Sequence, residues 1–216
     1  MNNIFQTPWF RLFKSHATKK SYKRGAIVCV QGEPFDKVGL VLSGKAVAYS
    51  YSINGRETWI GEYNQGRFIG LRALLANRAT SFEIRSAQNL DVLMISHLKM
   101  MELMQEHQDL CKAMAIDLSE RLNKSINDIV EVHSLSVKGR ICAELLRRAL
   151  PIGIDPDRQI IRPSPVFIEL ARRLNSSRET VSRTVSELQN KGILSREPGA
   201  LIVEDPERLQ DAIEFI

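Results

Sequence analysis

The stretch ELARRLNSSRETVSRTV, residues 169–185, decides the fold of the C-terminal part of this chain. Leu170 and Leu174 stand four residues apart, which places them on one face of a short helix. Asn175-Ser176 interrupts the pattern, and Ser177 is a good N-cap for a second helix. The stretch therefore predicts two short helices joined by a tight turn.

The second helix has distinct apolar and polar faces. Its apolar residues recur at spacings of four and three: Val181, Val185 and Leu188. Its polar residues fall elsewhere and are expected to face outward: Arg178, Glu179, Ser182 and Arg183. Arg and Glu at the start of such a helix are typical of a helix-turn-helix that enters the major groove of DNA. On this spacing alone, an ordinary helical hairpin with a solvated face stays open as the alternative.

The residues that follow favour DNA binding. Gly192 is a helix-stop residue, and the strand-like segments Ile193-Leu194 and 201–203 flank a Pro198-Gly199 turn. This part of the chain resembles the C-terminal domain of the CRP/FNR family of bacterial transcription regulators, in the order SRETVSR, a polar helix, GIL and the wing. Its recognition helix is most similar to the cyclic-AMP receptor protein type. Where that family has Gly in the turn, this chain has Asn175, which tolerates a left-handed conformation, so we expect the turn to survive.

Composition is that of a soluble globular protein, and its charge points mildly to a polyanionic partner. The chain has 216 residues, 44% hydrophobic and 25% charged, which is long enough for one or two domains with real cores. Net charge is +5 and the pI about 9.2. Residues 137–196 hold 12 Lys and Arg against 6 Asp and Glu, whereas the last twenty residues are acidic. The basic charge therefore coincides with the helix-turn-helix.

Several classes of protein are excluded by missing motifs. Cys29, Cys111 and Cys142 are far apart with no CxxC, which favours reduced thiols and a cytoplasmic location. No apolar run reaches 18 residues, so we expect no membrane partner. GxxxxGK, a nucleophile elbow and HExxH are absent, and residues 17–96 contain no His. We therefore predict a protein that is not an enzyme and has no metal site or cofactor.

The N-terminal half reads as a β-roll behind a short helix. Residues 1–24 predict an amphipathic helix packed on the next domain, with a membrane-surface helix as the alternative. Between Gly25 and Ile95 the candidate strands are AIVCV, VGLVLSG, AVAYSYSI, ETWIGEY and LDVLMI. Asn54-Gly55 predicts a type I′ hairpin. QGEPFDKVGLVLSGKAVAYS and YNQGRFIG resemble the cyclic-nucleotide-binding β-roll of the same family, with Leu71–Arg78 as the helix that closes the pocket.

A long helix is predicted from residues 107 to 133. Its apolar stripe recurs at spacings of three and four, which favours a two-fold dimer seam formed by Leu118, Leu122, Ile126 and Ile129. Packing against its own β-roll is the alternative. Residues 134–136 then read as a hinge, 137–150 as another helix, and 151–163 as a surface loop, with Ser164-Pro165 capping the helix-turn-helix.

The predicted fold class is α+β, in three parts. Residues 1–106 form an antiparallel β-roll of effector type, 107–136 the dimerisation helix and hinge, and 137–216 a winged helix-turn-helix that binds DNA. The resemblance implies that Arg178 and Arg183 read guanines and Glu179 a cytosine in a TGTGA-like half-site, with Ser177 and Thr180 on phosphates. A homodimer then reads double-stranded DNA as an inverted repeat. RNA polymerase as a further partner stays open.

The effector pocket departs from the family pattern. The family's cassette reads FGE, followed about ten residues on by Arg-Ser or Arg-Thr. Here Phe68-Ile69-Gly70 is followed by Leu71, and Thr80-Ser81 stands where the Arg pair is expected. Of two hydroxyl residues on the long helix, only Ser125 remains, beside Ile126.

We therefore predict a degenerate pocket and a regulator that does not depend on cyclic AMP. The residues of this pocket are Gly70, Leu71, Thr80, Ser81 and Ser125. A replacement charge could come from Arg72, Arg78 or Arg85. Three alternatives stay open: an unidentified small effector, control by abundance alone, and an interaction module that does not read DNA.

Overall fold

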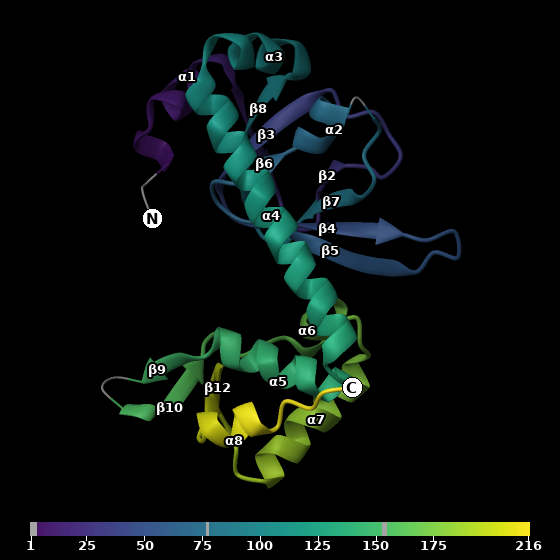
Figure 1. Cartoon of the computed structure of the whole chain (residues 1–216), viewed down its shortest axis with the longest axis vertical. Helices are drawn as coiled ribbons and strands as arrows, with labels where there is room; N and C mark the ends of the chain where they lie inside the picture. The colour runs from purple at the N-terminus through teal and green to yellow at the C-terminus, as the bar shows by residue number, and fades with distance from the viewer. Residues whose placement is uncertain (1–3, 77, 153–154) are drawn as a thin grey trace. The chain divides into compact units, whose positions relative to one another are not determined.

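The computed structural model describes residues 4–76, 78–152 and 155–216. They form two compact units, Met1–Asn123 and Lys124–Ile216, which divide the long helix α4 (Gln108–Ser134) between them. Figure 1 shows antiparallel strands in the first unit and short helices around a small sheet in the second. Over the described ranges, no helix combines the length and apolarity needed to cross a bilayer.

The first unit is a β-roll with helices at its ends. Its elements are η1 (Ile4–Gln6), α1 (Pro8–His16), β1 (Thr18–Tyr22), β2 (Ile27–Cys29), β3 (Lys37–Ser43), β4 (Ala46–Tyr51), β5 (Glu57–Tyr63), β6 (Phe68–Ile69), α2 (Leu71–Ala76), β7 (Glu83–Ser86), β8 (Leu90–Ser96), α3 (His97–Glu106) and the first part of α4. The strands pair antiparallel in two sheets, ordered β1-β8-β3-β6 and β2-β7-β4-β5.

The central strands of the first sheet, β3 and β8, are buried on both faces. One face packs against the second sheet, with Val41 and Val92 in the same core as Ala48 and Ile84. The other is covered by helices α1 to α4, whose buried side chains include Trp9, Phe10, Phe13, Met100 and Leu110. Burial on both faces explains why β3 and β8 are nearly continuous apolar runs, which sequence alone identified correctly.

Three strands of the first unit escaped the sequence prediction. The helix expected within residues 1–24 ends at His16, and Thr18–Tyr22 forms β1 instead. Most side chains of β1 are exposed, so nothing in its pattern marks a strand; its backbone is held by pairing with β8. Strands β6 and β7 are short and also depend on distant partners, β3 and β4.

The Asn54-Gly55 hairpin exists, but its turn is not type I′. Gly55 has a φ of 76°, whereas Asn54 is not in the positive-φ region that a type I′ turn needs at both positions. The Gly55 amide donates to the Ser52 carbonyl at 2.8 Å, and the Ser52 amide donates to the Arg56 carbonyl at 3.1 Å. The loop is therefore wider than two residues, with only the glycine left-handed.

The second unit is a winged helix-turn-helix. It contains the last part of α4, then α5 (Val137–Arg148), β9 (Leu150–Ile152), β10 (Asp155–Ile161), α6 (Phe167–Arg173), α7 (Arg178–Asn190), β11 (Leu194–Glu197), β12 (Ala200–Val203) and α8 (Pro206–Asp211). The sheet order is β11-β12-β10-β9. One apolar core joins α5, α6 and α7 to this sheet, with Ile141, Leu145, Leu170, Val185 and Leu201 at most 1% exposed.

Two predicted boundaries in this unit are wrong. Residues 151–163, predicted as a loop, are mostly strand, because β10 pairs with β12 at Gln159↔Val203 and Ile160↔Ile202; residues 153–154 lie outside the described residues. The helix predicted to reach Leu150 ends at Arg148.

The cap predicted at Ser164-Pro165 is also wrong. Helix α6 begins at Phe167, and its N-cap Val166 offers no side-chain hydrogen bond. The Ser164 amide instead donates to the Gly199 carbonyl in the wing turn at 2.8 Å. Ser164 is thus hydrogen-bonded to the wing, and α6 begins three residues later.

Candidate functional site

The turn between α6 and α7 has the predicted conformation. Leu170 and Leu174 are buried in the core of the unit. Asn175 has a φ of 50°, and no other non-glycine among the described residues has a positive φ. The Ser176 amide donates to the Ala171 carbonyl at 2.9 Å, which closes the turn. Asn175 therefore takes the left-handed role that the sequence assigned to it.

Ser177 caps α7, as predicted. Its hydroxyl accepts from the Thr180 amide at 3.0 Å and also lies 3.0 Å from the Thr180 hydroxyl. The helix then buries one face in the core: Val181, Thr184, Val185 and Leu188. This anchoring fixes the rotation of α7 about its own axis, so the opposite side chains face solvent.

Arg178, Glu179 and Arg183 are all exposed at the first two turns of α7. The backbone amide of Glu179, the Ser177 hydroxyl and the Arg178 charge hold the pKa of the Glu179 carboxyl below its usual value. Glu179 is therefore ionised at neutral pH and can only accept hydrogen bonds. Two forked donors and one acceptor thus share one exposed helix end, which suits base edges in a major groove.

A third arginine, not predicted from the sequence, lies beside this end. Arg196 of β11 and Arg178 line one hollow together with residues 164–168, which lead into α6. The Arg196 guanidinium lies over the Phe167 ring, 5.3 Å from its centroid. The sequence shows that Arg196 belongs to the predicted wing. Only the fold shows that it lines the same hollow as Arg178.

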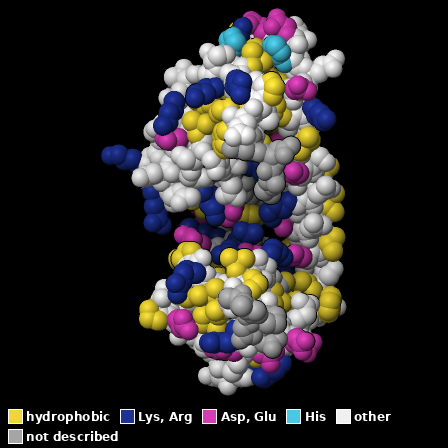
Figure 2. Space-filling model, turned by 90° about the vertical axis from the view of Figure 1, so that its left-hand side faces the viewer, with side chains coloured by type: hydrophobic (Ala, Val, Ile, Leu, Met, Phe, Trp, Pro, Cys, Tyr) yellow, Lys and Arg dark blue, Asp and Glu magenta, His cyan; other side chains and the backbone are white. Residues whose placement is uncertain are grey.

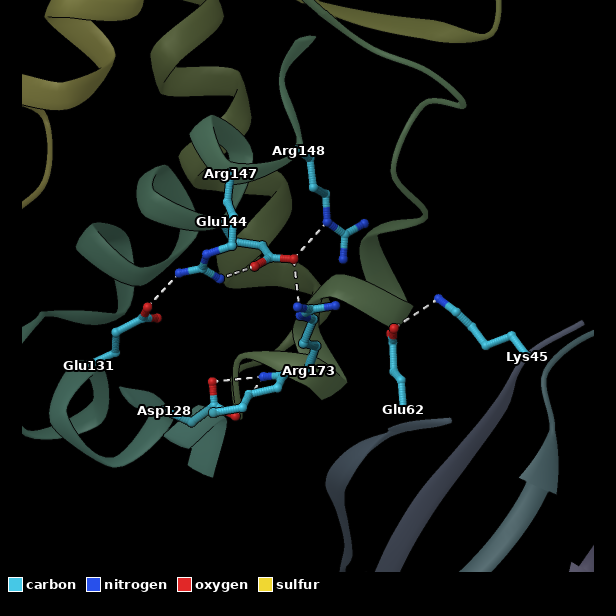
Figure 3. Close-up of polar contacts among 9 residues, drawn as sticks. Lys45, Glu62, Asp128, Glu131, Glu144, Arg147, Arg148 and Arg173 are labelled. Carbon is cyan, nitrogen blue, oxygen red and sulfur yellow. Dashed lines mark hydrogen bonds and ion pairs between the residues drawn. The ribbon is translucent and has the colours of Figure 1, made fainter. Parts of the chain in front are cut away.

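A buried charge cluster holds α6 against α5 (Figure 3). The Glu144 side chain is 1% exposed and forms ion pairs with Arg148 at 2.7 Å, Arg173 of α6 at 3.0 Å, and Arg147. Arg147 also reaches Glu131 of α4 at 2.5 Å. Because the buried Glu144 carboxylate is shared by arginines of α5 and α6, the cluster ties these two helices together.

Helix α4 carries unpartnered apolar side chains. Leu122 is 62% exposed, Ile126 48% and Ile129 59%, whereas Leu118 packs partly on the β-roll core. Figure 2 shows hydrophobic side chains along the outer surface of α4, at the right-hand edge. The predicted stripe is therefore divided: its start contacts the roll, which was the alternative weighed from the sequence, and its remainder has no partner within the described chain.

The residues of the degenerate pocket lie in different environments. Gly70 has a φ of 88° and approaches the Lys37 carbonyl so closely that a Cβ would lie 2.4 Å from it. Leu71, 3% exposed, points into the apolar core. The Thr80 hydroxyl donates to the carbonyls of Val30 and Glu33. Ser81 is half-buried, and Ser125 is exposed on the part of α4 that belongs to the second unit.

The candidate replacement arginines are not gathered into an anion site. Arg72 and Arg78 are exposed, and Arg85 forms ion pairs with Glu83 and, at 3.7 Å, with Glu57. Within the described part of the chain, no group of three or more His, Cys, Asp and Glu side chains could hold a metal ion.

A different arginine fastens α4 to the roll. The Arg121 guanidinium donates to the Phe68 carbonyl at 2.5 Å, lies 4.2 Å from the Tyr63 ring centroid, and forms an ion pair with Asp117 at 2.8 Å. Arg67 contacts the same carboxylate at 3.3 Å. The helix is thus joined to the cassette strand β6 by side chains of the protein itself.

Comparison with known proteins assigns both units. A cyclic nucleotide-binding domain family model matches residues 19–107, and a Crp-like helix-turn-helix domain model matches residues 139–212. The cAMP-activated global transcriptional regulator CRP of Escherichia coli O6:H1 is 25% identical over 202 residues, covering 91% of this chain and 94% of that protein. Vfr of Pseudomonas aeruginosa, also named a cAMP-activated global transcriptional regulator, is 23% identical over 198 residues, covering 88% and 90%.

Solved structures share the fold. The c-di-GMP responsive global regulator CLP of Xanthomonas campestris matches with a TM-score of 0.77 and 23% identity, covering 89% of this chain and 96% of that one. A CooA mutant from Carboxydothermus hydrogenoformans matches with a TM-score of 0.80 and 17% identity, covering 97% and 94%. With both family models and relatives along most of its length, the chain belongs to the CRP/FNR family of DNA-binding transcription regulators, which are not enzymes.

Proposed function

We propose that this regulator is a cytoplasmic homodimer that reads a TGTGA-like inverted repeat through α7 and does so without cyclic AMP. The observation that carries the proposal is the exposed end of α7, where Arg178, Glu179 and Arg183 project from a helix fixed by its buried face. Arg offers two donors to guanine O6 and N7, and Glu accepts from cytosine N4. In this proposal Ser177 and Thr180, at the same helix end, contact phosphates.

Dimerisation follows from the exposed part of the α4 stripe. Three apolar side chains are each about half-exposed or more: Leu122, Ile126 and Ile129. Exposure of apolar surface to water is unfavourable, and packing against a second copy of the same helix removes it. A two-fold axis along such a seam makes both helix-turn-helix units equivalent, so the DNA target is an inverted repeat with half-sites roughly 34 Å apart.

Independence from cyclic AMP rests on the cassette residues. Where the family has a Glu for the ribose, Leu71 is turned into the core. Where it has an Arg for the cyclic phosphate, this chain has Thr80, whose hydroxyl donates to the backbone carbonyls of residues 30 and 33. Loss of the charge-assisted Arg–phosphate contact removes most of the recognition of a cyclic phosphate. Arg121, already bonded to Phe68, offers a link between roll and helix that needs no nucleotide.

A small effector of another kind is the second candidate, because relatives of this fold respond to different molecules. CRP of Escherichia coli is named as cAMP-activated and CLP as c-di-GMP responsive. A roll that has lost one nucleotide chemistry can still serve another ligand.

A mobility-shift assay tests the proposal with nucleotide-free protein and a TGTGA inverted repeat. We expect tight binding without effector, a scrambled repeat bound far more weakly, and a log–log salt slope of about −0.9 per neutralised phosphate. Cyclic AMP and cyclic GMP should leave the affinity unchanged and give no heat in titration calorimetry. Binding that appears only with a nucleotide would refute the ligand-independent part. Equal binding to both DNAs would refute base reading.

A further inference from the structure

The segment that joins α4 to α5, residues 134–136, is not a free hinge. Residues 214–216, called here the tail, run antiparallel to it. The Ser136 amide donates to the Glu214 carbonyl at 2.9 Å, and the Ile216 amide donates to the Ser134 carbonyl at 3.0 Å. Leu135 and Phe215 form the bridge between them. The tail thus pairs like a short strand with residues 134–136, the segment about which the helix-turn-helix would have to rotate.

A shared cation ties the tail to the DNA-reading helix. Lys138 Nζ donates to Glu214 Oε1 at 2.8 Å and to Glu187 Oε1 of α7 at 3.0 Å. These two carboxylates, Glu214 first, raise the pKa of Lys138, so it stays charged at neutral pH. The junction, the tail and α7 are therefore connected through one side chain.

Gly139 makes room for this contact. It lies in the first turn of α5, and a Cβ there would lie 2.4 Å from the Glu214 carbonyl oxygen and 3.0 Å from its amide nitrogen. Glycine destabilises a helix relative to alanine, so the stability of α5 does not explain why glycine stands here. The glycine is explained by the close approach of the tail.

Two further contacts cross the junction. Arg140, 8% exposed, donates to the Leu135 carbonyl at 3.0 Å. Arg147 of α5 forms its ion pair with Glu131 of α4 at 2.5 Å. Residues 124–134 of α4 accordingly belong to the same compact unit as the winged helix-turn-helix.

We propose that the tail sets the spacing between half-sites that the dimer accepts. This inference rests on the proposed function, namely a dimer that uses α4 as its seam and reads an inverted repeat. When the junction is held, each α7 has one fixed position relative to the seam. When the tail is released, the junction keeps the Arg140 and Arg147 contacts but loses the strand pairing and the Lys138–Glu214 ion pair. Rotation at residues 134–136 then lets each DNA-reading unit swing. The dimer then reaches several spacings, because simultaneous engagement depends on geometry.

The test compares affinities for inverted repeats whose spacer is the preferred length or is longer by one, two or three base pairs. Two variants release the tail: Gly139→Ala, which leaves the helix intact, and a chain that stops at Ile213. Gly61→Ala is the matched control, because it lies in the β-roll with nothing within 4 Å of its Cβ position.

We expect wild type and G61A to lose roughly 10²-fold affinity on the wrong spacers, and both tail variants to lose less than about tenfold. Binding to a single half-site should stay within about twofold, which shows that the helix-turn-helix is folded. In the shortened chain, G139A should have no further effect on the spacer preference, because the tail with which its Cβ would clash is gone.

Spacer preferences that are equal in wild type and both variants would overturn the proposal. An added effect of G139A in the shortened chain would overturn it as well. A wild type that binds single half-sites and inverted repeats equally tightly would instead contradict the dimeric function on which the inference rests, so the two failures are distinguishable.

Discussion

Replacing Leu122 with Glu is expected to yield monomers and to weaken binding to the inverted repeat by roughly 10²–10⁴-fold, the avidity that linkage of two half-sites supplies. Leu122 is 62% exposed on α4. In a two-fold seam each substituted residue meets its own copy or a close neighbour, so the change places two carboxylates in an apolar contact. Light scattering should give 24.5 kDa rather than twice that mass.

Leu98→Glu is the matched control for this prediction. Leu98 lies on α3 and is 81% exposed, so the same chemical change occurs away from the proposed seam. It should leave both the dimer mass and the DNA affinity unchanged. A Leu122→Glu protein that keeps the mass of a dimer would show that the seam lies elsewhere.

Arg178→Ala or Arg183→Ala should cost about 1–3 kcal/mol of binding free energy to the cognate repeat and relax preference at one base pair per half-site. Each side chain is exposed at the start of α7, where a guanidinium can form two hydrogen bonds to one guanine. The measurement is a set of affinities for repeats substituted at each position in turn. The affected base pair should differ between the two variants.

Arg183→Lys separates base reading from charge. Lysine keeps the positive charge but lacks the fork, so the salt dependence should be retained while discrimination at that base pair falls. If Arg183→Ala instead lowered affinity equally for every sequence, Arg183 would be a phosphate contact and the proposed role in reading would be wrong.

The sequence predicted the parts of the fold whose signals are local. The Ser177 cap, the left-handed Asn175 and the stop at Gly192 each depend on residues within one or two turns, and all three are present. Strands β1 and β10 were missed because their pattern is exposed or interrupted by Pro and Asp. Only pairing with β8 and β12, distant in the chain, makes them strands.

For the candidate site too, the sequence predicted the residues of a single helix but not the contacts between separate elements. Arg178, Glu179 and Arg183 could be placed on the outer face of a helix because helical spacing is regular. Arg196, the Glu144 cluster and the tail could not, since each depends on two elements brought together by the fold. The roles of Arg178 and Arg183 in DNA binding are predictions that the experiments above test.

The most direct test of the central claim is selection of bound sites from random double-stranded DNA by the purified, nucleotide-free protein. We predict enrichment of an inverted repeat with TGTGA-like half-sites about one helical turn apart. The same repeat should emerge when cyclic AMP is present. Recovery of no common sequence, or of a repeat only in the presence of the nucleotide, would contradict the account.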